Sequence, residues 1–364
     1  MTMTGTTSWM NPYGPVDTTL NKWTRRVIET HFDPDTGTPF WLDWQEAQGI
    51  DVRARVTGFD DLTDIFEPFD EDVLRTLPVE QFVPRSLNGE RRVYETGGTT
   101  GAPKRVLMRD YWRQQARWMA RVLDHWEFPT GNVLGVAPPG GANNAGTFVQ
   151  HLAHEWGSLP FHVTMDPRWA KRLSERPSRE EFDEYVDHLL EQAERVLGSQ
   201  SIDVMFTTAR LLERPAVRDL VANSGIDGII HGGTSLDRDT YRVFREKWYA
   251  DQTLVGEYGN TLMGVAPEVP PTISAPEDRG YHLDYVPCYP QFVPEIVDDD
   301  GGLVDYGERG TVRLTVLNKE FFLPLFEERD VATRIRGTDP FPWDWVRTPA
   351  TGEDAEQNAV EGVY

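Results

Sequence analysis

Segments typical of buried strands alternate with segments typical of helices over residues 130–265. The run 133–137 is continuously apolar and leads into Pro-Pro-Gly-Gly, a pattern that favours a buried strand followed by a loop. Residues 182–196 place apolar side chains at three- and four-residue spacings, which predicts a long amphipathic helix. Short apolar runs at 204–206 and 228–230 are each followed by a helical pattern. This alternation predicts an α/β fold with a largely parallel sheet.

The sequence changes character after Pro267. Prolines that interrupt any helix follow at Pro270, Pro271, Pro276, Pro287, Pro290 and Pro294. Residues 311–316 alternate apolar with polar side chains, which indicates antiparallel strands. We therefore predict a small barrel-like β subdomain over about 267–330. The polar, acidic end of the chain predicts a short tail over 336–364.

The segment before residue 130 holds weaker patterns. The first ninety residues mix short helical stretches with acidic turns at 60–61 and 70–72. Two strand patterns follow at 92–95 and 105–108. Asp110 then stands where it can cap a helix with apolar positions at three- and four-residue steps.

The charge balance excludes one class of partner. The chain has 59 acidic and 36 basic residues and a net charge of -23, which would repel a nucleic-acid backbone. No apolar run is long enough to cross a bilayer, and the N-terminus lacks a signal-peptide pattern. The single cysteine, Cys288, fits a reducing compartment. We expect a cytoplasmic protein without nucleic-acid or membrane partners, in which any anionic ligand needs a local basic site.

A glycine-rich loop separates the two early strand patterns. Its residues are Thr96, Gly97, Gly98, Thr99, Thr100, Gly101, Ala102, Pro103 and Lys104. Glycines allow a tight turn that aims backbone N–H groups into one concavity, and Lys104 adds a cation at its edge. A Walker A loop would place its lysine directly after a glycine and would open a helix, so this loop differs from it. By composition alone, an ordinary hairpin turn is the alternative to a polyphosphate site.

The order Thr-Gly-Gly-Thr-Thr-Gly-x-Pro-Lys resembles the phosphate-binding signature of the adenylate-forming superfamily. That superfamily includes acyl-CoA synthetases, peptide-synthetase adenylation domains and luciferases. Three further segments match it in the same order: 231–236, 257–261 and 326–330. The resemblance covers roughly residues 90–335. It implies one N-terminal domain over 1–335, with nucleotide-binding α/β layers at about 90–265 and the β subdomain after them.

The resemblance also implies ligands and residue roles. ATP would be bound with Mg²⁺, the ion being held mostly by phosphates and water rather than by side chains. Lys104 and Thr261 would act in catalysis on the phosphates, Asp330 would hold the ribose, and Tyr258 would stack near adenine. The remaining nucleotide contacts would be Thr96 to Gly101, Gly232, Gly233, Thr234, Gly259, Asn260 and Arg347. The acid substrate would lie against Asn143, Asn144, His231 and Gly232.

Two departures from the superfamily pattern bear on activity. The Glu that follows Tyr-Gly-x-Thr and helps to hold Mg²⁺ is replaced by Leu262. The sequence also stops 34 residues after Asp330, so we expect the C-terminal lid subdomain and its catalytic lysine to be absent. The length, the Asn143-Asn144 loop and the missing lid are most similar to adenylating proteins of phenazine antibiotic pathways, of the griseoluteate type. That similarity implies an aromatic carboxylic acid as substrate and a downstream acyl-accepting or reducing enzyme as partner.

Two alternatives accompany these expectations. The missing Glu and lid also suggest an alternative, a binding module that delivers a nucleotide or carboxylate to a partner without efficient turnover. His151 and His154 could place two metal ligands on one helix face, but helical histidines without a third ligand usually serve packing, and we predict no metal-binding residue. The sequence leaves a homodimer open.

Overall fold

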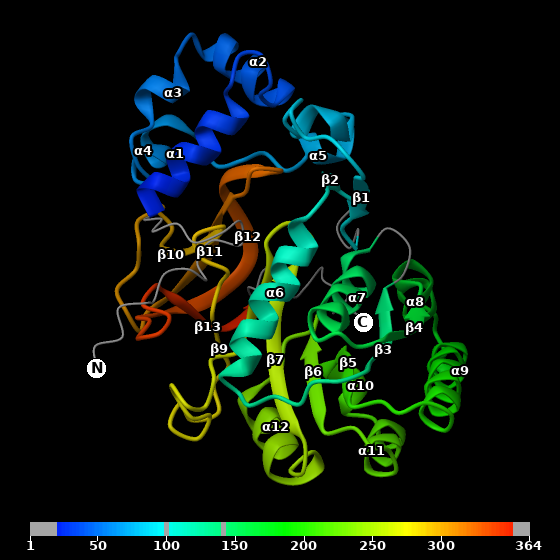
Figure 1. Cartoon of the computed structure of the whole chain (residues 1–364). Coiled ribbons are helices and arrows are strands. Elements are labelled where there is room, and N and C mark those ends of the chain that lie inside the picture. The colour runs from blue at the N-terminus through cyan, green and yellow to red at the C-terminus, as the bar shows by residue number, and fades with distance from the viewer. Residues whose placement is uncertain (1–19, 98–101, 140–142, 352–364) are drawn as a thin grey trace.

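The computed structural model of the chain describes residues 20–97, 102–139 and 143–351 (Figure 1). Its main layer is a six-stranded sheet with the order β4-β3-β5-β6-β7-β8. All neighbouring strands run parallel except β7 and β8. The strands are β3 (Val133–Pro139), β4 (Pro160–Met165), β5 (Val204–Thr208), β6 (Gly228–Gly232), β7 (Thr253–Asn260) and β8 (Gly264–Pro267). The predicted α/β layer with a largely parallel sheet is confirmed.

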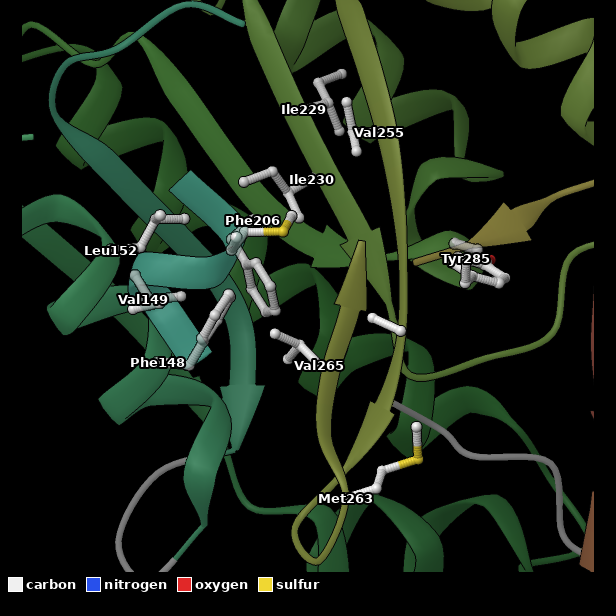
Figure 2. Packing of buried hydrophobic residues seen from close by; sticks show 14 of the residues in the cluster. Phe148, Val149, Leu152, Phe206, Ile229, Ile230, Val255, Met263, Val265 and Tyr285 are labelled. Atoms are coloured by element: carbon white, nitrogen blue, oxygen red, sulfur yellow. The ribbon is translucent and has the colours of Figure 1, made fainter. Parts of the chain in front are cut away.

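Helices cover this sheet because the strands are apolar on both faces. The helices of this layer are α6 (Tyr111–Asp124), α7 (Asn144–Glu155), α8 (Pro167–Ser174), α9 (Glu180–Leu197), α10 (Ala209–Leu212), α11 (Pro215–Ala222), α12 (Arg238–Val243) and the π-helical turn η3 (Phe244–Trp248). α7 packs on β3 and β4, and α6 packs on α7 and β8. Figure 2 shows Phe148 of α7 directed toward Phe206 of β5, with ring centroids 5.7 Å apart. The predicted amphipathic helix over 182–196 lies within α9.

Asp110 does occupy the position before α6, but its side chain makes no capping hydrogen bond. Its carboxylate instead pairs with Arg109 and Arg113. The buried carboxylate of Glu320 accepts the backbone N–H groups of Arg109 and Asp110 at 2.8 to 3.0 Å. The predicted cap by Asp110 is therefore wrong, because a residue distant in sequence satisfies this helix end.

A second sheet is antiparallel and has the order β10-β11-β12-β13-β9. Its strands are β9 (Asp284–Tyr285), β10 (Phe292–Val297), β11 (Arg309–Leu317), β12 (Phe322–Ile335) and β13 (Trp345–Thr351). β13 pairs with both β12 and β9, so residues 345–351 are a central strand rather than part of a tail. This corrects the predicted end of the β region near residue 330. Within the described residues the sheet ends at β10 and β9, so it is open.

The N-terminal helices pack on this second sheet. They are α1 (Leu20–His31), α2 (Pro39–Gln48), α3 (Val52–Arg55), α4 (Asp61–Ile65) and α5 (Val73–Thr76), followed by the 3₁₀ turn η2 (Val79–Phe82). Trp23 and Trp41 lie in one apolar cluster with Phe322 of β12. The indole of Trp23 donates a hydrogen bond to the carbonyl of Leu317 at 2.7 Å. α5 lies beside the hairpin of β1 (Arg92–Glu95) and β2 (Arg105–Met108), as Figure 1 shows.

Candidate functional site

A cavity of about 350 Å³ lies where the carboxyl ends of β3, β5, β6 and β7 meet. Ligands of open α/β sheets bind at this edge, because the loops that leave the strands there form a crevice. Apolar side chains of Val136, Ala137 and Phe206 line one part of its wall. Asn143 and Asn144, at the start of α7, also line this cavity.

A smaller hollow of about 180 Å³ adjoins the cavity. Its walls come from the segment that follows β6 and from β7, β9, β12 and β13, and they include Thr234, Tyr258 and Asp330. Gly233, Glu257 and Gly259 line both spaces, so these residues mark where the two meet. The two hollows together bring the following predicted site residues to one place: Thr96, Gly97, Lys104, Asn143, Asn144, Gly232, Gly233, Thr234, Tyr258, Gly259, Asn260, Thr261 and Asp330.

The glycine-rich loop joins two paired strands, as predicted. The N–H of Thr96 donates to the carbonyl of Lys104 at 3.0 Å, and the N–H of Lys104 donates to Oγ1 of Thr96 at 3.0 Å. These bonds close the base of the loop. Nζ of Lys104 contacts the carboxylate of Glu71 and lies 5.3 Å from the ring centroid of Phe326. Gly98, Thr99, Thr100 and Gly101 lie outside the described residues.

The turn between β7 and β8 is held by side chains that the sequence singled out. Oδ1 of Asn260 accepts the N–H groups of Leu262 and Met263 at 2.9 and 3.1 Å. Oγ1 of Thr261 donates to Oδ1 of Asn144 at 3.1 Å, which links the turn to α7. Leu262 is 1 % exposed and fills the position at which the superfamily pattern has a glutamate.

Tyr258 and Asp330 join the two sheets across the smaller hollow. The Tyr258 hydroxyl donates to Oδ2 of Asp330 at 2.8 Å. Burial raises the pKa of Asp330 above its usual value, although the bond from Tyr258 opposes the shift. Oγ1 of Thr234, in the same hollow, is enclosed and makes no hydrogen bond within the described structure. The hollow thus offers a hydroxyl, an aromatic ring and a carboxylate to a ligand.

Two residues that were predicted to contact a ligand do not line either hollow. His231 is buried in β6, where desolvation lowers its pKa to about 4, and it does not line either hollow. Arg347 of β13 forms two hydrogen bonds to the carboxylate of Asp284, at 2.7 and 2.9 Å. Arg347 also lies outside the residues that line the two spaces.

Four acidic residues in the cavity wall were missed: Glu71, Glu257, Glu327 and Glu328. Glu71 lies in an acidic turn whose composition is typical of solvent-exposed loops. Glu328 accepts a hydrogen bond from Nδ2 of Asn260 at 2.6 Å, and burial raises its pKa to about 7. Glu257, directly before Tyr258, also has its pKa raised to about 7 by burial. The only sequence signal for Glu257 and Glu328 was that they lie inside segments 257–261 and 326–330, which resemble the superfamily pattern at other residues.

Comparisons with known proteins establish the fold. No protein-family model matches the chain, and no curated protein resembles it in sequence. A structure of 2-hydroxyisobutyryl-CoA ligase in the postadenylation state matches 91% of this chain and 65% of that chain, with 13% identity and a TM-score of 0.61. An open conformation of that ligase, in complex with 2-HIB-AMP and CoA, matches 95% of this chain and 81% of its own chain, with 14% identity and a TM-score of 0.63. The chain has the fold of the adenylate-forming ligases. The expected fold class, the N-terminal domain of that superfamily, is confirmed.

Two further observations concern ions and membranes. Among residues 20–97, 102–139 and 143–351, no three His, Cys, Asp or Glu side chains are grouped so that they could bind a metal ion. Every helix in the described part of the chain falls short of the length and apolarity that a membrane crossing requires.

Proposed function

We propose that the chain joins a carboxylic acid to ATP, forming an acyl-adenylate and pyrophosphate. One observation carries this proposal: residues from four separate segments, matched to the phosphates, the ribose and the adenine of ATP, converge on two adjoining hollows. Lys104 and Thr261 line the larger cavity, and Tyr258 and Asp330 line the smaller hollow. The fold supports the same chemistry, since it is shared with a ligase described in a postadenylation state.

The reaction needs alignment and charge neutralisation more than covalent help. A carboxylate oxygen of the acid attacks the α-phosphorus, the bond between that phosphorus and the β-bridging oxygen breaks, and pyrophosphate leaves with the electron pair. Lys104 would neutralise the β- and γ-phosphates. Thr261 would donate to the α-phosphate, and Asp330 would accept hydrogen bonds from the ribose hydroxyls. Tyr258 would lie against adenine while its hydroxyl orients Asp330.

The cavity contains a carboxylate that could bind Mg²⁺ in place of the superfamily glutamate. Mg²⁺ is commonly bound by one or two carboxylates together with phosphates and water. Leu262 cannot act as a ligand, but Glu328 lines the same cavity and has one carboxylate oxygen held by Asn260. We propose that phosphates and water hold most of the ion and that Glu328 supplies the carboxylate. The ion would offset negative charge on the phosphates.

We further propose that the acid is aromatic, with the phenazine type as one case, and that the adenylate passes to a downstream acyl-accepting or reducing enzyme. The apolar wall of Val136, Ala137 and Phe206 supports a flat hydrophobic group. The partner follows from the resemblance to phenazine-pathway proteins and from the chemistry, because an acyl-adenylate is an activated intermediate that needs an acceptor.

The test is ATP–pyrophosphate exchange with a panel of aryl acids. Exchange with one or more acids is expected. Lys104→Ala should lower the exchange rate by about tenfold or more, in line with the loss of a preorganised charge at the reacting phosphates. Lys247→Ala, which alters an exposed lysine on η3, is the matched control. Absence of exchange with every acid, or an unchanged rate in Lys104→Ala, would contradict the proposal.

A nucleotide- or carboxylate-delivery module is the second candidate. The buried Leu262 favours it, because the carboxylate expected at that position is missing. Mass spectrometry of the purified chain after incubation with ATP and an acid separates the two candidates. A retained nucleotide without any adduct supports delivery, whereas an acyl-AMP mass supports adenylation.

A further inference from the structure

Glu257 lies at the junction of the two hollows. It belongs to β7 and lines both the cavity and the smaller space beside it. Its Oε2 atom is enclosed by protein and accepts no hydrogen bond within the described structure. Buried carboxylates are ordinarily paired or hydrogen-bonded, so an unpaired one in a cavity wall requires an explanation.

The neighbouring strand is built around this side chain. Gly232 ends β6 beside Glu257, and a Cβ atom added at Gly232 would lie 2.2 Å from Oε1 and 2.7 Å from Cγ of Glu257. Any larger residue at position 232 would therefore displace the carboxyl group. Gly232, which also lines the cavity, thus makes room for an acidic side chain.

Other polar side chains around the apolar part of the cavity already have partners. Oγ1 of Thr207 donates to the carbonyl of Val136 at 3.1 Å. Oγ1 of Thr208 accepts the N–H of Leu211 at 3.3 Å, which caps α10. Asn144 is engaged by Thr261. Glu257 thus differs from these neighbours in keeping an enclosed acceptor oxygen for something that enters the cavity.

We propose that Glu257 binds a hydrogen-bond-donating substituent, an amino or hydroxyl group, on the carboxylic acid. The chain would then select acids that carry such a group over the same acids without it. This inference rests on the proposed adenylation function, which defines what enters the cavity. A site built to pair with a polar group discriminates strongly against analogues that lack it, because the buried protein group is then left unpaired.

Binding measurements test this without turnover. The probes are benzoate and its amino- and hydroxybenzoate derivatives, titrated calorimetrically into the chain with an ATP analogue that has a methylene between the α- and β-phosphorus. The wild type should bind at least one donor-bearing acid about tenfold or more tighter than benzoate. Glu257→Leu should remove that preference while leaving benzoate affinity within about threefold. Those ratios correspond to about 1.4 and 0.7 kcal/mol.

Two further variants keep the test specific. Gly232→Ala should displace the carboxyl and reduce the same preference, although residue 257 is unchanged. Asp251→Asn alters an exposed acid near the start of β7 and should keep the wild-type preference. Affinity for the ATP analogue alone, measured for each variant, shows whether the nucleotide site is folded.

The outcomes separate the inference from the proposed function. A wild type that does not distinguish benzoate from its derivatives, or that binds none of them, overturns the inference. If Glu257→Leu weakens the binding of all acids equally, the inference is overturned as well. A loss of affinity for the ATP analogue alone also overturns it, because that result would assign Glu257 to adenine. A donor preference without any acyl-AMP under turnover conditions supports the inference and contradicts adenylation.

Discussion

The ammonium group of Lys104 contacts the carboxylate of Glu71, which comes from the turn before α5 and not from the glycine-rich loop. Arg75 extends this contact: it pairs with Glu71 at 3.2 Å and donates from Nε to the carbonyl of Ala102 at 3.0 Å. Burial tends to raise the pKa of Glu71, but Lys104 and Arg75 hold it below its usual value. If Lys104 binds the phosphates as proposed, Glu71 is an anion that competes with them for Lys104.

Glu71→Gln is expected to tighten ATP binding by about three- to tenfold, or about 0.7 to 1.4 kcal/mol. The substitution removes a negative charge from the cavity wall and releases Lys104 for the phosphates. Calorimetric titration with ATP and Mg²⁺ measures the change. Asp72→Asn is the control, because Asp72 also pairs with Arg75 but its side chain is 77% exposed. Weaker binding in Glu71→Gln would show that Glu71 organises the loop instead of competing for Lys104.

Glu328→Gln is expected to raise the Mg²⁺ concentration for half-maximal pyrophosphate exchange by about fivefold or more. The reason is that an amide is a weaker Mg²⁺ ligand than a carboxylate, and Leu262 offers no substitute. The ATP dependence at saturating Mg²⁺ should change little. Glu90→Gln, at an exposed position that lines neither hollow, is the comparison variant. An unchanged Mg²⁺ requirement in Glu328→Gln would remove Glu328 from the ion site.

Much of the fold could be predicted from local pattern, because residues 133–137 of β3 and all of β5 and β6 form continuous buried runs. β13 escaped prediction because it contains Pro349 and a bulge at Thr348, whose φ is +43°. Its pairing with β12 and β9 depends on contacts between segments far apart in the sequence.

The site was predicted only in part, for a related reason. Motif order located most residues of both hollows, but it could not tell which way a side chain points. All five residues of β6 are buried, so no alternation marked His231 as facing away from the cavity. Glu71 reaches Lys104 across 33 positions of sequence, and no local pattern indicates that contact.

The enclosed Glu257 should make stability depend on pH. Its pKa is about 7 in the folded chain against 4.5 when exposed, because burial disfavours the charged form. Between these values the folded state holds a proton that the unfolded state has lost, so this contribution to the free energy of unfolding falls as pH rises from about 4.5 to 7. Tyr285, the titratable group facing it from β9, has a pKa well above its usual value and stays neutral there.

Glu257→Gln, which cannot ionise, should therefore exceed the wild type in stability at pH 8 by at most about 3 kcal/mol. The difference should shrink toward zero near pH 4, where the wild-type carboxyl is protonated in the folded state and mostly protonated in the unfolded state. Urea unfolding of the ligand-free chain at several pH values measures it. If the difference in free energy of unfolding between the variant and the wild type is constant with pH, the folded state does not disfavour ionisation of Glu257.

Glu320 should be the residue that stabilises the start of α6. Its carboxylate accepts the N–H groups of Arg109 and Asp110, whereas the side chain of Asp110 makes no capping bond. Removing a group that satisfies a helix end costs about 1 to 2 kcal/mol, so Glu320→Ala should lower the free energy of unfolding by that amount.

Asp110→Ala should cost less, about 0.5 kcal/mol, because it removes only partly exposed ion pairs with Arg109 and Arg113. Denaturant unfolding of both variants gives the comparison. A larger loss in Asp110→Ala than in Glu320→Ala would restore Asp110 as the cap that the sequence indicated. A larger loss of stability in Glu320→Ala than in Asp110→Ala would assign the cap to Glu320, which lies between β11 and β12 of the second sheet. This residue would then hold the start of α6, the helix that packs on α7 beside the cavity.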